Sequence, residues 1–321
     1  MIKFVRVSLY LPALALLQVA VFAQAPVGGN VGVQQGIAVR QAIDTAQRGP
    51  PLRPGARGVF SAGATHVASS GFEDAGDVSV SRWSAGAGVE HVATNGSLFG
   101  FVFDHERSRY DFHDDPAGIA SGIETVTANR FGVNVRRSLT ETWSLFGNLD
   151  TTFNVAKGAE WSDGQTAGGL VSFSRRVNPR FSFSLGVLAR SRLEERFQIL
   201  PIPGIDWKIT DRLSLRTAQG VTLSWQVDDR RKWMADLAAG FESRAFRLDE
   251  SGPLPGGVIK DRRVPLTASL RYAPNPGMSA RVFAGAAFAQ QLEFMDSEGH
   301  TADKVDADPS FVAGVSGSVR F

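Results

Sequence analysis

Apolar and polar residues alternate along most of this chain, from Arg57 to Phe321. In the segment 181–192, the odd positions up to 189 carry Phe, Phe, Leu, Val and Ala, whereas the even positions carry Ser, Ser, Gly, Leu, Arg and Arg. Similar two-faced segments occur at 99–107, 123–137, 143–155, 233–244, 264–272 and 311–321. Because successive side chains of a β-strand point to opposite sides, each segment predicts a strand with one apolar and one polar or small face. The pattern therefore predicts an all-β protein.

Two all-β architectures share this pattern, a soluble sandwich and a transmembrane antiparallel barrel. The segments favour the barrel, because many exceed the ~5–6 residues usual in globular sheets and match the ~9–11 needed to cross a bilayer. Short and long connectors also alternate, as expected for short periplasmic turns and long outer loops. The long loops are expected at 69–76, 114–122, 157–164, 193–203, 249–262 and 295–307. Aromatic residues at segment ends are typical of interfacial girdles; they are Tyr110, Phe112, Trp143, Trp207, Trp233 and Tyr272.

Residues 1–23 have the three-part form of a secretory signal peptide. Lys3 and Arg6 precede an apolar run at 9–21, and a cleavage-type triplet ends at Ala23. The run is shorter than the ~20 residues of a membrane-spanning helix. Residues 24–56 are rich in Gly, Pro, Gln and Ala, a composition that predicts a flexible segment. We therefore expect an exported protein with a cleaved signal peptide, a flexible N-terminal segment and one barrel over 57–321.

The end of the chain carries a further signal. Val315 and Val319 alternate with small or polar residues, and Phe321 places an aromatic ring at the C-terminus. This ending resembles the assembly signal of Gram-negative outer-membrane β-barrels. The stretch 200–215 is similar to the central hairpin of an uncharacterised outer-membrane β-barrel domain family. The resemblance implies an outer-membrane location, contact with outer-membrane lipid and lipopolysaccharide, and recognition of Phe321 by the general barrel-assembly machinery; it brings no activity or cofactor.

The strand count follows from parity, because a barrel that starts and ends in the periplasm has an even number of strands. Short turns at 210–212 and 228–231 require an outer turn between them, and residues 218–220 are the candidate. This arrangement gives 14 strands. The segments 213–217 and 221–227 are short for spanning strands, so a count of 12 stays open as the alternative. Either size exceeds the ~8-stranded barrels that side chains fill.

The same parity assigns a mixed set of charges to the barrel interior, since a charge facing lipid at mid-depth costs ~2–4 kcal/mol. The candidate lumen-lining residues are Arg82, Glu90, Asp104, Glu106, Arg130, Arg136, Asp150, Arg176, Arg190, Arg192, Asp236, Glu242, Arg244 and Arg271. Two interpretations stay open. The charges either line a water-filled path and bias it, for example toward anions, or pair across the lumen and close it.

Composition narrows the function. The chain has 34 Lys+Arg against 32 Asp+Glu, and removal of Lys3 and Arg6 with the signal peptide leaves these numbers equal. Nucleic-acid binding is not expected without a basic excess. The absence of cysteine excludes disulfides, thiolate metal sites and a cysteine nucleophile. No cofactor or metal site is predicted.

The stretch Asp104–Asp115 is the densest polar segment and contains His105 and His113. A histidine among carboxylates at the outer rim is a pattern for a hydrolase, but neighbouring strand residues point to opposite faces, so His105 cannot share a face with Asp104 or Glu106. We therefore expect no enzyme. The leading hypothesis is a passive, porin-like channel for small hydrophilic solutes. The alternatives are a closed barrel that binds through its outer loops and, third, a hydrolase at the rim.

Overall fold

Sixteen strands and one 3₁₀ helix make up the regular structure of the residues described, which are 54–72, 76–114, 123–193, 195–217 and 220–321 of a computed structural model. The strands are β1 (Gly55–Gly71), β2 (Asp77–Val92), β3 (Leu98–His113), β4 (Thr125–Ser138), β5 (Trp143–Ala156), β6 (Gln165–Asn178), β7 (Phe181–Arg192), β8 (Glu195–Lys208), β9 (Leu213–Thr217), β10 (Val221–Gln226), β11 (Trp233–Ala239), β12 (Glu242–Arg247), β13 (Val258–Asn275), β14 (Met278–Met295), β15 (Thr301–Ala307) and β16 (Ser310–Arg320). The 3₁₀ helix η2 spans Trp161–Gly164. No helix in these ranges is long and apolar enough to cross a membrane.

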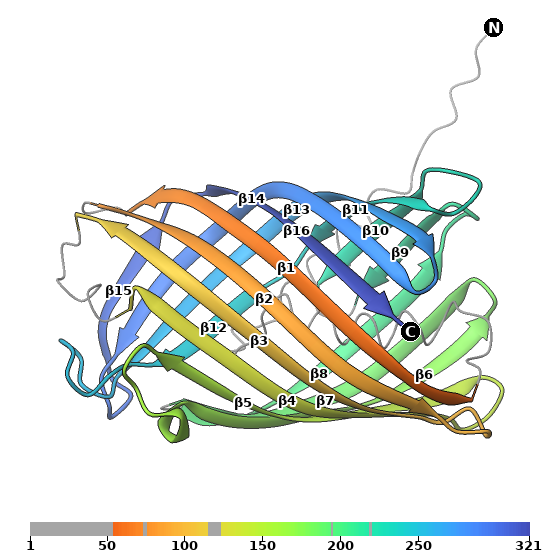
Figure 1. Ribbon diagram of the computed structural model, residues 1–321, viewed down its shortest axis with the longest axis horizontal. Coiled ribbons are helices and arrows are strands. Elements are labelled where there is room, and N and C mark those ends of the chain that lie inside the picture. The colour runs from red at the N-terminus through yellow and green to blue at the C-terminus, as the bar shows by residue number, and fades with distance from the viewer. Residues whose placement is uncertain (1–53, 73–75, 115–122, 194, 218–219) are drawn as a thin grey trace, which may run out of the picture.

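Fourteen of the strands form a closed antiparallel wall (Figure 1). Each strand from β1 to β10 pairs with the next, β11 pairs with β13, β13 with β14, and β14 with β16. The wall closes where β16 pairs with β1. The predicted count of 14 is confirmed, because the short strands β9 and β10 form a wall hairpin. The expected turn at the tip of this hairpin includes 218–219, which lie outside the described residues.

The two ends of the barrel differ in their connectors. The short turns, such as 139–142, 179–180 and 209–212, lie at the end where β1 starts and the chain terminates, as Figure 1 shows. The backbone N–H of Gly58 donates to the carbonyl of Phe321 at 2.9 Å, and the N–H of Phe321 donates back at 3.1 Å. The Phe321 ring also stacks on Phe60, with 5.9 Å between centroids. We refer to this end as the periplasmic end and to the other as the outer end.

Three of the expected long loops are wrong in part. Strand β8 begins at Glu195 inside the expected loop 193–203, β13 begins at Val258 inside 249–262, and β15 lies inside 295–307. Pro201 and Pro203 suggested a loop because proline lacks the N–H that a sheet needs. Strand β8 accepts both because it pairs with β9 only over 205–208. The preceding part of β8, which contains both prolines, has no pairing with β9 and is therefore an edge, where proline is tolerated.

Side chains on the outward face form an apolar belt that includes Phe99, Phe101 and Leu149, which are 48%, 68% and 69% exposed. Trp233 lies against Tyr272, with 4.6 Å between ring centroids, near the periplasmic ends of β11 and β13. The girdle expected there from Trp143, Trp207 and Trp233 matches their partial exposure. The same expectation is wrong for Tyr110 and Phe112, since these rings belong to the barrel interior.

Candidate functional site

The outer half of the lumen is occupied by a small sheet that folds in from the wall. This inner sheet consists of β12, residues 258–263 of β13, residues 290–295 of β14, and β15. On one side Arg247 pairs with Val155 of β5, and on the other the N–H of Asp308 donates to the carbonyl of Gly71 at the end of β1. The inner sheet therefore closes a second time on β1 to β5, across the lumen.

Irregularities in three adjacent strands coincide where the inner sheet leaves the wall. Gly240 follows the last residue of β11, and its N–H donates to the carbonyl of Pro265 at 3.3 Å. The pairing of β13 with β14 shifts register between Arg262 and Val264. Nearby in β14, Ala289 has a φ of 48°, a left-handed conformation that is uncommon outside glycine. Such bulges bend a strand and re-aim its side chains.

An apolar core fills the space between the inner sheet and β1 to β5. Its fully buried members include Phe246 and Ile259 from the inner sheet and Val80, Tyr110 and Val126 from the wall. Burying one large apolar side chain contributes about 1.5–3 kcal/mol. The outer half of the barrel is thus packed on this side like the interior of a globular protein.

Within that core, the carboxylate of Asp261 is surrounded by donors. Arg82 donates to Asp261 Oδ2 at 2.5 Å and the Tyr110 hydroxyl donates to the same atom at 2.7 Å. Arg263 forms an ion pair with the same carboxylate. The side chains of Arg82, Asp261 and Arg263 are at most 5% exposed. Leaving a buried charge without its partner costs about 3–5 kcal/mol, so this cluster fixes the position of β13 in the lumen.

A second buried cluster fixes β12. Arg244 Nε donates to Glu106 Oε1 at 2.8 Å and its Nη2 donates to Glu106 Oε2 at 3.3 Å. Arg244 Nη1 also donates to Glu242 at 2.9 Å. Bidentate contacts of this kind are the most specific ion pairs. The two clusters together contain three arginines and three carboxylates and carry no net charge.

Further ion pairs lie along the inner wall outside the inner sheet. Arg190 donates to Asp150 at 2.7 Å with both side chains 3% exposed, and Arg130 is paired with Asp104. These two pairs also balance. The charge-paired interpretation of the lumen therefore describes the middle and outer parts of the barrel.

The periplasmic half of the lumen, which we call the vestibule, is more open, although it also holds the ion pairs Arg216–Asp206 and Arg320–Glu90. Small residues leave its inner face partly exposed: Ser61, Ser84, Gly86, Ser172, Ser184, Ser279, Ser316 and Ser318. On β13 and β14, Arg271 and Arg281 lie directly opposite each other and both point inward. Like charges in such a cross-strand position repel each other. An anion between the two guanidinium groups would offset that repulsion.

The inner wall of the barrel also has an apolar side. Phe146, Leu170 and Leu188 are buried on the inner face of β5 to β7, with Leu200 and Ile202 of β8 packed against them. These strands follow one another in the wall, while Arg271 and Arg281 lie on the later strands β13 and β14. The inner wall therefore has an apolar side on β5 to β8, at mid-height, and a cationic pair on β13 and β14 nearer the periplasmic end.

All the lumen-lining residues proposed from the sequence lie on the inward side of their strands or in the inner sheet. Arg176 is the most peripheral; it is exposed at the periplasmic mouth and donates to the carbonyl of Glu141. Sequence reasoning missed Tyr110, Asp261 and Arg263. Asp261 and Arg263 could have been recognised from the four consecutive charges at 260–263. A strand with charges on both faces has no face that can contact lipid, so protein must cover both faces.

The polar stretch 104–115 does not assemble a catalytic site from its described members. His105 points outward, its Nδ1 lies 2.8 Å from Asn129 Oδ1, and its ring packs on Trp83. Asp104 and Glu106 point inward. His113 lies 3.4 Å from Asp77 at the outer end, where both are well exposed. Residue 115 lies outside the described residues.

The fold and lumen define this protein as a transmembrane β-barrel of the outer-membrane type. The chain belongs to a family described as "Domain of unknown function (DUF6268)", which matches residues 119–321. No curated protein matches.

Similar solved structures are barrels. One is described as an outer membrane channel from Pseudomonas putida F1, with 9% identity over 86% of this chain and 98% of the other and a TM-score of 0.46. A mutant of the monoaromatic hydrocarbon channel TodX has 7% identity over 84% and 91%, with a TM-score of 0.46. The translocator domain of the autotransporter NalP from Neisseria meningitidis has 12% identity over 90% and 95%, with a TM-score of 0.39.

Proposed function

We propose that this protein is an outer-membrane channel for small, negatively charged organic solutes. The observation that carries the proposal is the pair Arg271 and Arg281, two cations that face each other inside a partly exposed vestibule. On β1 and β16 the inward-facing cations Arg57 and Arg320 lie at the same end of the barrel. Glu90 of β2 stands opposite Arg57 and lies 3.9 Å from the Arg320 guanidinium. Cations lining a pore attract anions and repel other cations.

The apolar wall opposite refines the class of solute. A carboxylate or phosphate group would contact the arginines near the periplasmic end, and Phe146, Leu170 and Leu188 would contact the apolar part of a solute as it passes mid-height. Binding sites for small molecules commonly combine an apolar lining with a few placed polar groups. The inner sheet limits passage through the outer half to narrow solutes.

The proposal predicts an anion-selective conductance that depends on the arginine pair. The mature chain would be refolded in detergent and inserted into a planar bilayer with a KCl gradient. Wild type is expected to give a reversal potential that favours chloride. Arg271→Gln together with Arg281→Gln is expected to move that potential toward the cation side. The matched control is Arg137→Gln with Arg175→Gln, which removes two charges from the outward face and is expected to leave the potential unchanged.

One outcome favours a second function. The charge-neutral clusters and the apolar core of the outer half also suit a closed barrel that acts through its outer surface. Folded wild-type protein that shows no conductance at any voltage would contradict the channel and support that alternative. Conductance with no change of selectivity in the Arg271 and Arg281 variant would contradict the anion-binding vestibule.

A further inference from the structure

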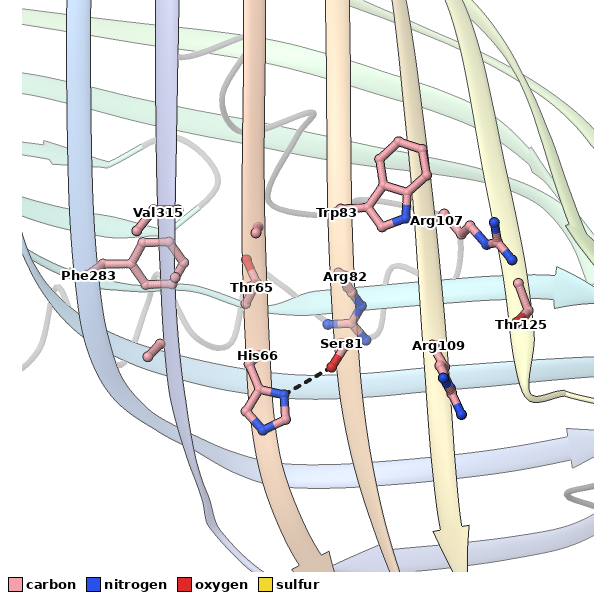
Figure 2. Close-up of a pocket in the computed structure, with 13 residues that line it drawn as sticks. Thr65, His66, Ser81, Arg82, Trp83, Arg107, Arg109, Thr125, Phe283 and Val315 are labelled. Atoms are coloured by element: carbon pink, nitrogen blue, oxygen red, sulfur yellow. Dashed lines mark hydrogen bonds between the residues drawn. The ribbon is translucent and has the colours of Figure 1, made fainter.

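A pocket of about 710 Å³ lies on the outward face of the wall, toward the outer end of β16, β1, β2 and β3 (Figure 2). Its floor is made of small or aliphatic residues, chiefly Ala64, Ala313 and Val315. Trp83 from β2 borders it. On the lipid side of a barrel, a hollow with an apolar floor and an aromatic border is shaped to take a hydrocarbon chain.

Two arginines and a histidine stand over the same pocket. Arg107 and Arg109 are two residues apart on β3, so both point outward, and both are exposed. His66 from β1 lies in the same row, with its Nδ1 3.0 Å from Ser81 Oγ. Figure 2 shows these side chains projecting from neighbouring strands around the pocket. Within the part of the chain that the structure describes, neither guanidinium has an ion pair or a side-chain hydrogen bond.

The level of these cations on the wall identifies what they meet. A charge facing hydrocarbon at mid-depth costs ~2–4 kcal/mol, and the cost falls to about 0–1 near the interface. Arg107 pairs directly with Trp83, a residue type enriched at membrane interfaces. Arg109 is one step nearer the outer end, and Asp111 follows on the same face toward the rim. The cations therefore lie at the level of lipid headgroups in the outer leaflet.

We propose that this pocket binds a phosphorylated glycolipid of the outer leaflet, the chemistry of lipopolysaccharide. A lipid phosphate contacts Arg107 and Arg109, and one acyl chain lies on the floor formed by Ala64 and Val315. Arginine recognises phosphate through parallel N–H···O bonds, which gives geometric specificity as well as affinity. The site faces away from the lumen, so it does not depend on the proposed channel function.

The test uses the full mature chain, refolded in detergent and checked for a folded barrel by its gel mobility before and after heating. Lipid A with two phosphates is the probe, and retention is measured by native mass spectrometry. Wild type is expected to retain one lipid, and Arg107→Gln with Arg109→Gln to lose affinity by about tenfold or more. The control pair Arg137→Gln and Arg175→Gln, at the periplasmic end of the same outward face, is expected to bind as wild type does.

Two further measurements keep the proposal open to contradiction. Ala64→Phe fills the floor and leaves both arginines in place, and it is expected to weaken binding even if the arginine variant folds poorly. Dephosphorylated lipid A is expected to bind at least tenfold more weakly than the phosphorylated form. Equal retention by wild type and both pocket variants, or equal binding of the two lipids, overturns the proposal. Displacement by millimolar inorganic phosphate would identify a site for the free ion and also overturns the lipid assignment.

Discussion

The outer and periplasmic halves of the barrel differ in how deeply their inward-facing charges are buried. In the outer half, Asp261 accepts from Arg82, Arg263 and Tyr110, and every member of that cluster is buried. In the vestibule, Arg271 and Arg281 face each other on neighbouring strands, and both are partly exposed to the lumen. The first arrangement is balanced and holds a sheet in place. The second places two like charges side by side where the lumen reaches them.

This difference shows that charges on the inner face of a barrel do not have one meaning. A buried charge is tolerated when it is paired and hydrogen-bonded, and the pair then specifies a structure. A cation that water reaches keeps its field for an anion in the lumen. Burial, rather than inward direction alone, separates the two roles in this protein.

The largest change in stability is expected from removing the charge of Asp261, the carboxylate at the centre of the outer cluster. Asp261→Asn keeps the shape of the side chain but removes the counter-charge of Arg82 and leaves Arg263 with only Glu242, at 3.8 Å. We expect the free energy of unfolding to fall by about 3–5 kcal/mol. Urea titration of the barrel in lipid vesicles, followed by tryptophan fluorescence, would measure the loss.

The matched variant in the other half is Asp236→Asn. Asp236 points into the lumen from β11 and is contacted by Ser269 Oγ at 3.4 Å. We expect a change in the free energy of unfolding of about 0.5 kcal/mol or less. If Asp261→Asn and Asp236→Asn destabilise the protein equally, the outer cluster is not the structural element that the geometry describes.

A smaller effect is expected from the apolar core. Phe246 of β12 is 1% exposed and packs in the cluster between the inner sheet and the wall. Phe246→Ala should lower the free energy of unfolding by about 3 kcal/mol and loosen the inner sheet, so that single-channel conductance rises. Leu200→Ala, in the partly buried apolar patch on β5 to β8, should lower the free energy of unfolding by about 1 kcal/mol and leave conductance near the wild-type value. An unchanged conductance in Phe246→Ala would show that the inner sheet does not limit passage.

The sequence was sufficient for the wall because the physics of the wall is local. Each spanning strand needs an apolar outward face, so segments such as 143–155 and 181–192 show the period of two that identified them. Arg82, Asp104 and Arg190, which the same parity assigned to the interior, lie on the inward side of β2, β3 and β7. Strand β16, at the end of the chain, closes the wall by pairing with β1. The hairpin of β9 and β10 brings the number of wall strands to 14.

The inner sheet could not be predicted in the same way. Both faces of residues 258–263 are covered by protein, so no lipid-facing alternation marks them, and their charges suggested an outer loop. Tyr110 was also misassigned, because an aromatic ring near a strand end is compatible with an interfacial girdle as well as with a protein core. The decisive contact, Arg82 with Asp261, joins residues 179 positions apart in the sequence. Which charges are balanced depends on such pairings, and a single sequence does not contain them.

The smallest predicted effect concerns two turns, one at each end of the barrel. In both turns an aspartate accepts hydrogen bonds from backbone N–H groups, so the two ends should respond to pH in the same way. At the periplasmic end, the carboxylate of Asp228 accepts from the backbone N–H of Trp233 at 2.8 Å and of Lys232 at 3.2 Å, and these bonds lower its pKa below the ordinary 3.8. At the outer end, Asp296 accepts from the N–H of His300 at 2.9 Å and of Glu298 at 3.0 Å, which lowers its pKa in the same direction.

A carboxylate whose pKa is lowered by folding stabilises the folded state at a pH above its unfolded pKa, and that contribution is lost as the pH falls through the folded pKa. Asp228→Asn should therefore be slightly less stable than wild type at pH 6, and the difference should shrink as the pH is lowered past 3.8. Hydrogen exchange is expected to locate the change in β10 and β11, with the amides of the inner sheet unaffected. Asp296→Asn should show the same pH dependence in β14 and β15. If the pH-dependent change in hydrogen exchange instead extended through both halves of the barrel, the turns would be coupled to the buried clusters. The outer half and the vestibule would then be less independent than the geometry indicates.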